Sequence, residues 1–92
     1  MVIELVTPDE KVFEGEVVSA TLPGSDGSFQ VLNDHAALIS TLGRGWIKVK
    51  TDPKNPKKEV HFEVDGGIVE VKNNKIVVLA EAVFGDKKLD VE

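Results

Sequence analysis

The chain of 92 residues lacks cysteine and has no long apolar run. Without cysteine it can form neither a disulfide framework nor a structural zinc site of the cysteine type, and it has no thiol nucleophile. No apolar stretch approaches the ~18 residues that a membrane-spanning helix needs. The amino terminus, MVIELVTPDE, shows neither a secretory signal nor a transit peptide. We therefore expect a protein suited to a reducing cytoplasm, which reaches a membrane only through a partner.

Basic residues are outnumbered by acidic ones, which gives the chain a formal net charge of −5. Nucleic-acid binding draws on clustered lysine and arginine, so this balance argues against nucleic acid as the partner. The exception is residues 44–58, where Asp52 is the only acid among Arg44, Lys48, Lys50, Lys54, Lys57 and Lys58. This stretch is either a solvated hairpin whose lysines discourage aggregation or a patch that meets an acidic partner surface. The sequence leaves both interpretations open.

Apolar and polar residues alternate with a period of two through most of the chain, as in half-buried strands. The clearest runs are 17–22, 46–50 and 59–64. Turn residues separate the predicted strands at 8–9, 23–24, 43–45, 52–56, 65–67 and 73–74. The only helical hint, at 35–40, is too short to be more than a turn. We predict one domain over residues 1–92, all-β, a small antiparallel β-sandwich or flattened barrel of about eight to ten short strands.

The alternation also predicts which side chains form the core. It directs inward the residues Ile47, Val49, Val60, Phe62 and Val64. Trp46 and Ile68 are then directed outward or toward an end of the sandwich. Trp46 either plugs the barrel or anchors an interface, where tryptophan is enriched. Residues 76–80 are apolar on both faces, so Val78 is expected to contact another chain, unless Val83 and Phe84 fold back over this strand.

No pattern of residues indicates catalysis. A nucleophile needs an adjacent base and an orienting group, whereas His35 and His61 fall on a predicted loop and on the polar face of a predicted strand. Neither HxH nor HExxH spacing is present, so we expect no metal. The GSDG turn lacks the downstream Gly-Lys-Ser/Thr of a phosphate-binding loop. We therefore expect a protein that is not an enzyme and binds no cofactor.

The segment GSDGSFQVLNDHAAL, residues 24–38, is the most distinctive part of the chain. Gly24 and Gly27 permit positive φ, and Ser25 and Asp26 can accept hydrogen bonds from the backbone of the turn. His35 carries a side chain that titrates near neutrality. We interpret the segment as a contact loop.

This loop belongs to an ordered set of segments that resembles the epsilon subunit of F-type ATP synthases. The set comprises LVTPDEKVFEGEV, the glycine loop that leads to His35-Ala36, GWIKV, VDGGIVEV and KIVVLAEAVFG. Departures from the family pattern occur at Gln30, at Asn33-Asp34, where members commonly have Pro-Gly, and at Ala37. The resemblance implies a non-catalytic rotor subunit of the central stalk, which couples the gamma subunit to the c-ring during proton-driven ATP synthesis. It also implies a peripheral position on the cytoplasmic face of the bacterial inner membrane.

The resemblance also implies where the partners bind. Thr7 and Ser28 are expected at the end that faces the ring, and Ser28 stands where many members have an acidic residue. His35 and Ala36 match the family's His-Ala pair and are expected where gamma and the ring meet. Alternatively, His35 holds its own backbone through a ring nitrogen. Trp46 and Val78 complete the predicted partner contacts.

Members of this family usually continue into two helices, whereas this sequence stops at Glu92. We therefore expect coupling without a helical brake on ATP hydrolysis and without a bound nucleotide. The alternative from another class is a biotinyl or lipoyl carrier domain, which presents one lysine at a hairpin tip. Lys75 is the nearest candidate, but the sequence context typical of those tips is missing.

Overall fold

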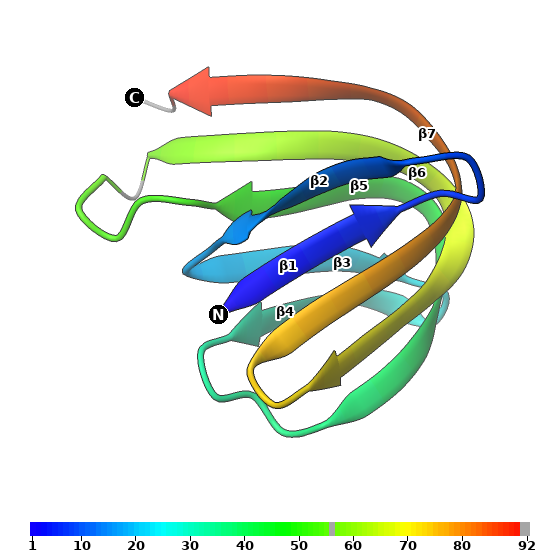
Figure 1. Ribbon diagram of the computed structural model, residues 1–92, viewed down its shortest axis with the longest axis horizontal. Coiled ribbons are helices and arrows are strands. Elements are labelled where there is room, and N and C mark those ends of the chain that lie inside the picture. Colours follow the sequence, from blue (N-terminus) through cyan, green and yellow to red (C-terminus); the bar gives the residue numbers. More distant parts are fainter. Residues whose placement is uncertain (56, 91–92) are drawn as a thin grey trace.

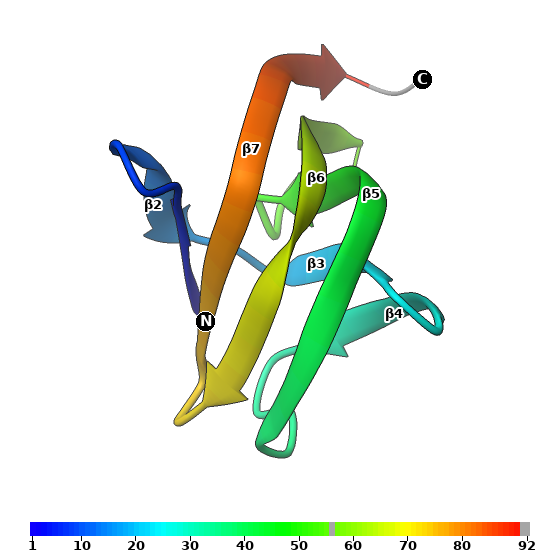
Figure 2. The same cartoon turned by 90° about the vertical axis from the view of Figure 1, so that its right-hand side faces the viewer.

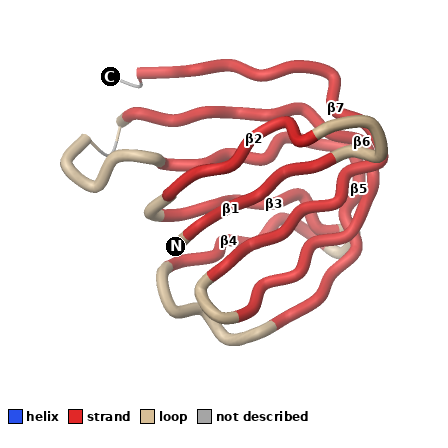
Figure 3. The backbone as a smooth tube through the Cα atoms, viewed as in Figure 1, coloured by secondary structure: helices blue, strands red, loops and turns tan. Residues whose placement is uncertain are grey.

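The described part of the chain consists of strands and loops, as Figure 3 shows. The computed structural model describes residues 1–55 and 57–90. Its strands are β1 (Val2–Val6), β2 (Lys11–Glu16), β3 (Ser19–Gly24), β4 (Gly27–Leu32), β5 (Leu38–Lys50), β6 (Lys58–Lys72) and β7 (Lys75–Asp90). They form one sheet in the order β2-β1-β7-β6-β5-β3-β4. The all-β prediction is confirmed.

The three long strands β5, β6 and β7 bend sharply, so that the single sheet folds over into two layers (Figures 1 and 2). The bends lie side by side, because Arg44 pairs with Asp65 and Asp65 pairs with Ala82. In β6 the bend uses Gly66 and Gly67, whose φ angles are 73° and 135°. Such angles are unfavourable for residues with a side chain. The glycine pair thus lets β6 continue from one layer into the other.

The core lies between the two layers and follows the predicted alternation. Fully buried side chains come from strands throughout the sheet and include Ile3, Leu5, Leu22, Val31, Ile47, Val49, Val64, Val69, Val71, Ile76 and Val78. Phe13 of β2 packs against Phe62 of β6 with ring centroids 5.1 Å apart, which joins the edge strand β2 to the core. The five predicted inward residues, Ile47, Val49, Val60, Phe62 and Val64, are all buried. The two layers confirm the small β-sandwich.

The strands are fewer and longer than predicted. The predicted turns at 43–45 and 65–67 are bends within β5 and β6, so the described chain has seven strands in place of eight to ten. A glycine that permits a turn also permits a bend, so local composition does not distinguish the two. The pairing is antiparallel throughout except between β1 and β7, which run parallel. Residues 38–40 belong to β5 and residues 35–37 to the loop before it, so the segment 35–40 forms no helix and the expected turn does not extend to residue 40.

The glycine loop is a tight hairpin between β3 and β4. Gly24 pairs with Gly27, and only Ser25 and Asp26 lie between them. Gly27 has a φ of 132°, as predicted, whereas Gly24 has no positive φ. Gly24 is required for packing instead, because a β-carbon there would lie 2.6 Å from the carbonyl oxygen of Gly27. The turn at Asn73 and Asn74 is a second two-residue hairpin, with both φ angles positive.

Candidate docking site

Three exposed apolar side chains lie on the outer side of the layer that contains β1 and the first half of β7. Ile39, Ile68 and Leu79 keep 71%, 46% and 53% of their surface exposed. Ile68 and Leu79 are direct cross-strand partners, and Ile39 lies on β5 two residues before Thr41, the other partner of Ile68. We call these three residues the outer apolar face. Large apolar side chains gathered on a surface are typical of docking sites.

Strand alternation determines which side chains of β7 reach this face. Ile76, Val78 and Ala80 are buried, whereas Val77 is half-buried and Leu79 is exposed. The prediction that Val78 contacts a partner is therefore wrong, because its side chain is enclosed in the core. The underlying observation, a strand that is apolar on both sides, is correct. The side chain available to a partner is that of Leu79, one residue further along.

The segment Val83–Phe84 does not cover the outer apolar face. Val83 packs against the core, and the ring of Phe84 lies under the guanidinium of Arg44, 4.7 Å from the ring centroid. Both residues follow the bend in β7, while Leu79 precedes it and stays exposed. The alternative in which this segment folds back over the strand is thus wrong.

Acidic residues border the outer apolar face. Glu70 is the cross-strand partner of Ile39 on one side and of Val77 on the other, and Glu4 is the partner of Val77 on β1. Lys11 lies 3.0 Å from a carboxylate oxygen of Glu4, and this contact lowers the pKa of that carboxyl. The same contact, together with Glu14, raises the pKa of Lys11.

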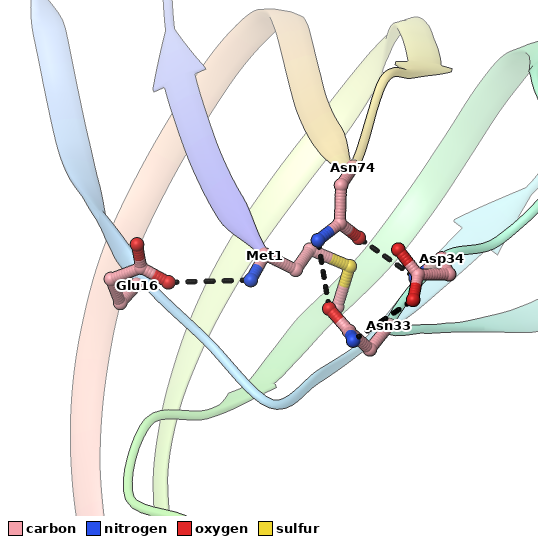
Figure 4. A network of polar contacts seen from close by, with 5 residues as sticks. All are labelled: Met1, Glu16, Asn33, Asp34 and Asn74. Carbon is pink, nitrogen blue, oxygen red and sulfur yellow. Dashed lines mark hydrogen bonds and ion pairs between the residues drawn. The ribbon is translucent and has the colours of Figure 1, made fainter.

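A polar network holds the loop that precedes His35 (Figure 4). Asn74, in the turn between β6 and β7, accepts a hydrogen bond from the backbone N–H of Asp34 at 2.8 Å and donates one to Asn33 at 2.8 Å. Asp34 has a positive φ of 60°, which aspartate tolerates better than most residues. The Asn33-Asp34 departure from the family pattern is therefore accommodated by a side-chain bridge across 40 residues of sequence.

His35 is half-buried and engages its own loop. Its Nδ1 lies 2.7 Å from the carbonyl oxygen of Ala36, and its backbone N–H donates to the carbonyl oxygen of Leu32 at 3.2 Å. The ring thus holds its own backbone, as the alternative interpretation of His35 predicted. His35 and Ile39 line the same hollow of about 300 Å³.

Thr7 and Ser28 are not brought together. Thr7 closes the turn between β1 and β2: its hydroxyl oxygen accepts from the N–H groups of Asp9 and Glu10 at 3.4 and 3.3 Å. Ser28 is exposed on β4, where it pairs with Pro23. The β1–β2 turn and the β3–β4 hairpin lie at the same end of the molecule, on the right in Figure 1, and stand apart across that end in Figure 2. Thr7 and Ser28 therefore belong to two separate loops at one end of the sandwich.

Trp46 lies outside the core and does not plug it. It is half-buried on β5, past the bend, with its ring against the edge of His61 at 6.3 Å between centroids. His61 in turn lies 2.8 Å from a carboxylate oxygen of Glu59. His61 and His35 occupy different parts of the fold, and no group of three potential metal ligands occurs among the described residues.

Sequence reasoning missed Ile39 and Leu79. Both could have been found from the period of two, because each is the apolar residue between two inward positions of its strand. The carrier alternative receives no support from the turn at Asn73 and Asn74, since Lys75 begins β7 and does not stand at the hairpin tip. Among the described residues, none lie in a helix with the length and apolar character to cross a membrane.

Comparison with known families identifies the sandwich. The family model described as ATP synthase, Delta/Epsilon chain, beta-sandwich domain matches residues 1–85. The chain belongs to this family. Among curated relatives of this delta/epsilon-type sandwich, an ATP synthase epsilon chain from Salinibacter ruber is 39% identical over 97 residues, covering 100% of this chain and 65% of the relative. One from Chlorobium limicola is 38% identical over 81 residues, covering 88% of this chain and 89% of the relative.

Two solved structures share the fold of this delta/epsilon-type sandwich. A chain of the Euglena gracilis mitochondrial ATP synthase, in a structure of OSCP, F1 and c-ring, superposes with a TM-score of 0.81 at 20% identity, over 91% of this chain and 52% of that one. A chain of the central stalk and c-ring of the Tetrahymena thermophila mitochondrial enzyme gives 0.73 at 21% identity, over 90% and 64%. The chain thus spans about half to two thirds of these structural neighbours and 65% of the Salinibacter relative.

Proposed function

We propose that this delta/epsilon-type sandwich is a rotor subunit of the central stalk of an F-type ATP synthase, where it joins a gamma subunit to the c-ring. In this role it transmits rotation and transfers no chemical group. Its family, the names of its curated relatives and the rotor structures that contain its structural neighbours support the proposal. The observation that carries it is the outer apolar face of Ile39, Ile68 and Leu79, which an isolated sandwich has no reason to expose together.

The outer apolar face is the proposed contact with gamma. Each square ångström of apolar surface removed from water contributes roughly 25 cal/mol, so covering three large aliphatic side chains favours association. A stable contact usually buries over ~1,200 Å² in total, which requires the surrounding strand surface as well. Glu4 and Glu70 border the face and would pair with basic residues of the partner, which fixes its orientation more than it adds affinity.

The β3–β4 hairpin is the proposed contact with the ring. Its tip is fixed to β5 by two hydrogen bonds: Thr41 donates its hydroxyl to Ser25 at 2.8 Å, and Ser25 donates its backbone N–H to the carbonyl of Thr41 at 3.0 Å. A part that transmits torque needs such a rigid projection. Ser28 follows directly on this hairpin, and Thr41 is also the cross-strand partner of Ile68. Ring contact and gamma contact would therefore be linked through one strand.

His35 and Ala36 are proposed to lie between the two contacts. The hollow that His35 and Ile39 share also includes Phe29 and Gln30 of β4, so it connects the outer apolar face to the hairpin. The self-contact of His35 with Ala36 would hold the loop in shape for either partner. The β1–β2 turn lies at the same end of the molecule as the hairpin (Figure 1), and Thr7, which closes this turn, is proposed to contact the ring as well. As a rotor part, the chain would be peripheral to the cytoplasmic face of a bacterial inner membrane and would bind neither cofactor nor nucleotide.

Co-elution with the gamma subunit tests the proposal. Leu79→Asp places a charge on the outer apolar face, where desolvation opposes binding. Leu32→Asp is a matched control, because Leu32 has the same residue type and the same 53% exposure but lies on β4. We expect Leu79→Asp to lose co-elution while Leu32→Asp retains it, with both variants folded by circular dichroism. Retention of gamma by both variants, or loss by both, would overturn the assignment of the gamma contact to this face.

A further inference from the structure

A groove of about 460 Å³ lies between the β1–β2 turn and β7. One wall is made by the six consecutive residues Glu81–Asp86. Alternate residues of a strand point to opposite faces, so a groove that crosses a face is lined by every second residue. A groove lined by consecutive residues must run along the edge of the strand. The wall is therefore the backbone edge of β7.

This edge has no strand partner among the described residues. Pairing with β1 ends where Val6 meets Leu79, whereas pairing with β6 continues to Asp90. The N–H of Val2 donates to the carbonyl oxygen of Asn74, so backbone groups of even-numbered residues face the β1 side of β7. The pairing of β7 with β6 keeps one register from Lys75 to Val83, so this alternation continues past the end of β1. Ala82 is the first residue past that point whose backbone N–H and C=O are directed to the unpaired edge. An unpaired edge of this kind can accept an added strand.

The charge of the groove selects the occupant. Asp9 and Glu10 stand on the turn and Asp86 stands on β7, whereas the carboxylate of Glu81 lies against Gly66 on the β6 side of β7. Among the residues whose side chains the structure describes, no lysine or arginine lines the groove. The guanidinium of Arg44 is engaged with Phe84 and lies 3.9 Å from Asp65. Phe84 forms a bulge, because Val64 pairs with Val83 and Glu63 pairs with Gly85. The straight part of the free edge is short, so a short segment suits it.

We propose that the groove between the β1–β2 turn and β7 binds a short extended segment of another protein, rich in lysine or arginine, by strand addition along Glu81–Val83. Main-chain hydrogen bonds to Ala82 supply the alignment. Basic side chains of the added segment meet Asp9 and Glu10 on the turn. The site is separate from the outer apolar face and does not depend on the gamma contact.

Nuclear magnetic resonance of the full 92-residue chain tests the proposal. The probe is a short synthetic peptide of alternating lysine and valine, with two comparison peptides: one with glutamate for lysine, and one N-methylated at alternate backbone positions. We expect the lysine peptide to shift the amide signals of residues 81–86 and 9–10 and to slow amide exchange at Ala82. The other two peptides should leave these signals in place. Binding of the lysine peptide should weaken as salt is raised.

Two variants separate the charge from the edge. Asp9→Lys with Glu10→Lys should weaken binding of the lysine peptide by about tenfold or more and allow the glutamate peptide to bind. The matched control Asp26→Lys with Glu70→Lys changes net charge equally at acids outside the groove and should leave the affinity nearly unchanged. Ala82→Pro removes the outward N–H without removing a β6 pairing donor, since proline is tolerated at free edges. It should abolish the peptide-induced shifts of residues 83–86 and 9–10 while thermal unfolding remains cooperative.

Four results would overturn the proposal. The first is equal binding of the lysine and glutamate peptides. The second is equal binding of the N-methylated peptide. The third is a set of shifts centred on residues 51–58 or on the outer apolar face in place of residues 81–86. The fourth is concentration-dependent shifts of residues 81–86 without peptide, which would assign the edge to a second copy of this chain.

Discussion

Gly67 of β6 lies so close to Leu79 of β7 that a β-carbon on Gly67 would overlap the carbonyl oxygen of Leu79. The two residues are diagonal neighbours in the sheet, since Gly67 pairs with Ala80 and Leu79 pairs with Ile68. The bend of the sheet and the outer apolar face therefore meet at this contact. A change at Gly67 would alter both the passage of β6 between layers and the position of Leu79.

We expect Gly67→Ala to destabilise the fold by more than about 2 kcal/mol, because it combines a strained φ of 135° with a backbone overlap. Gly43→Ala, in the neighbouring bend of β5, is the control. A β-carbon at Gly43 meets no atom within 4 Å, and its φ is not positive. The control should change stability by less than about 0.5 kcal/mol. Chemical denaturation measures both, and equal stabilities would show that the β6 bend tolerates a side chain.

The sequence predicted the two-layer sandwich because period-two alternation depends on local residue order. Ile47, Val49 and Val64 could be placed inward without knowledge of their partners. Strand length could not be predicted in the same way. Whether Gly66-Gly67 ends a strand or bends it depends on the neighbouring strands, which supply pairing on both sides of the bend. That information is distant in sequence.

Val78 and Leu79 should respond differently to truncation. Val78→Ala removes buried methyl groups and leaves a cavity, so we expect a loss of about 2 kcal/mol in the free energy of unfolding. Leu79→Ala removes a side chain that is largely in water and should change stability by less than about 0.5 kcal/mol. Urea denaturation of the isolated chain measures both. A larger loss for Leu79→Ala than for Val78→Ala would reverse the assignment of the two faces of β7.

The turn at Asn73 and Asn74 offers a test of the polar network. Both residues have positive φ, so glycine suits each position, but it is the side chain of Asn74 that bridges to Asn33 and Asp34. Asn74→Gly should cost about 1 kcal/mol through loss of the bonds to Asn33 and Asp34. Asn73→Gly should be close to neutral. Thermal unfolding compares them, and a neutral Asn74→Gly would show that the network does not support the loop before His35.

The candidate site was only partly predictable for a related reason. The side-chain partners of His35 are local, so its contact with Ala36 could be anticipated from the chain itself. The bridge from Asn74 to Asp34 spans 40 residues and left no local pattern. The same holds for Thr7 and Ser28. The turn and the hairpin that carry them lie at one end of the molecule (Figure 1), but their separation across that end (Figure 2) depends on the order of strands in the whole sheet.

The ion pair between Glu4 and Lys11 predicts a specific dependence of stability on acidity. Lys11, by its hydrogen bond, holds the pKa of Glu4 below its ordinary value, which is about 4.3 in an unfolded chain. A carboxyl whose pKa is lower in the folded state stabilises the fold fully above the unfolded value and loses this contribution as pH falls through the folded value.

Glu4→Gln removes the titrating carboxyl of this pair. We expect its unfolding temperature to lie below that of the wild type at neutral pH, with the difference closing as pH falls through and below about 4.3. Glu70→Gln is the control, because Glu70 is an exposed strand acid with no ion pair among the described residues. Its unfolding temperature at neutral pH should stay close to that of the wild type. Scanning calorimetry across this pH range gives both curves. A gap between Glu4→Gln and the wild type that stays constant down to acid pH would show that the pair does not couple protonation to folding.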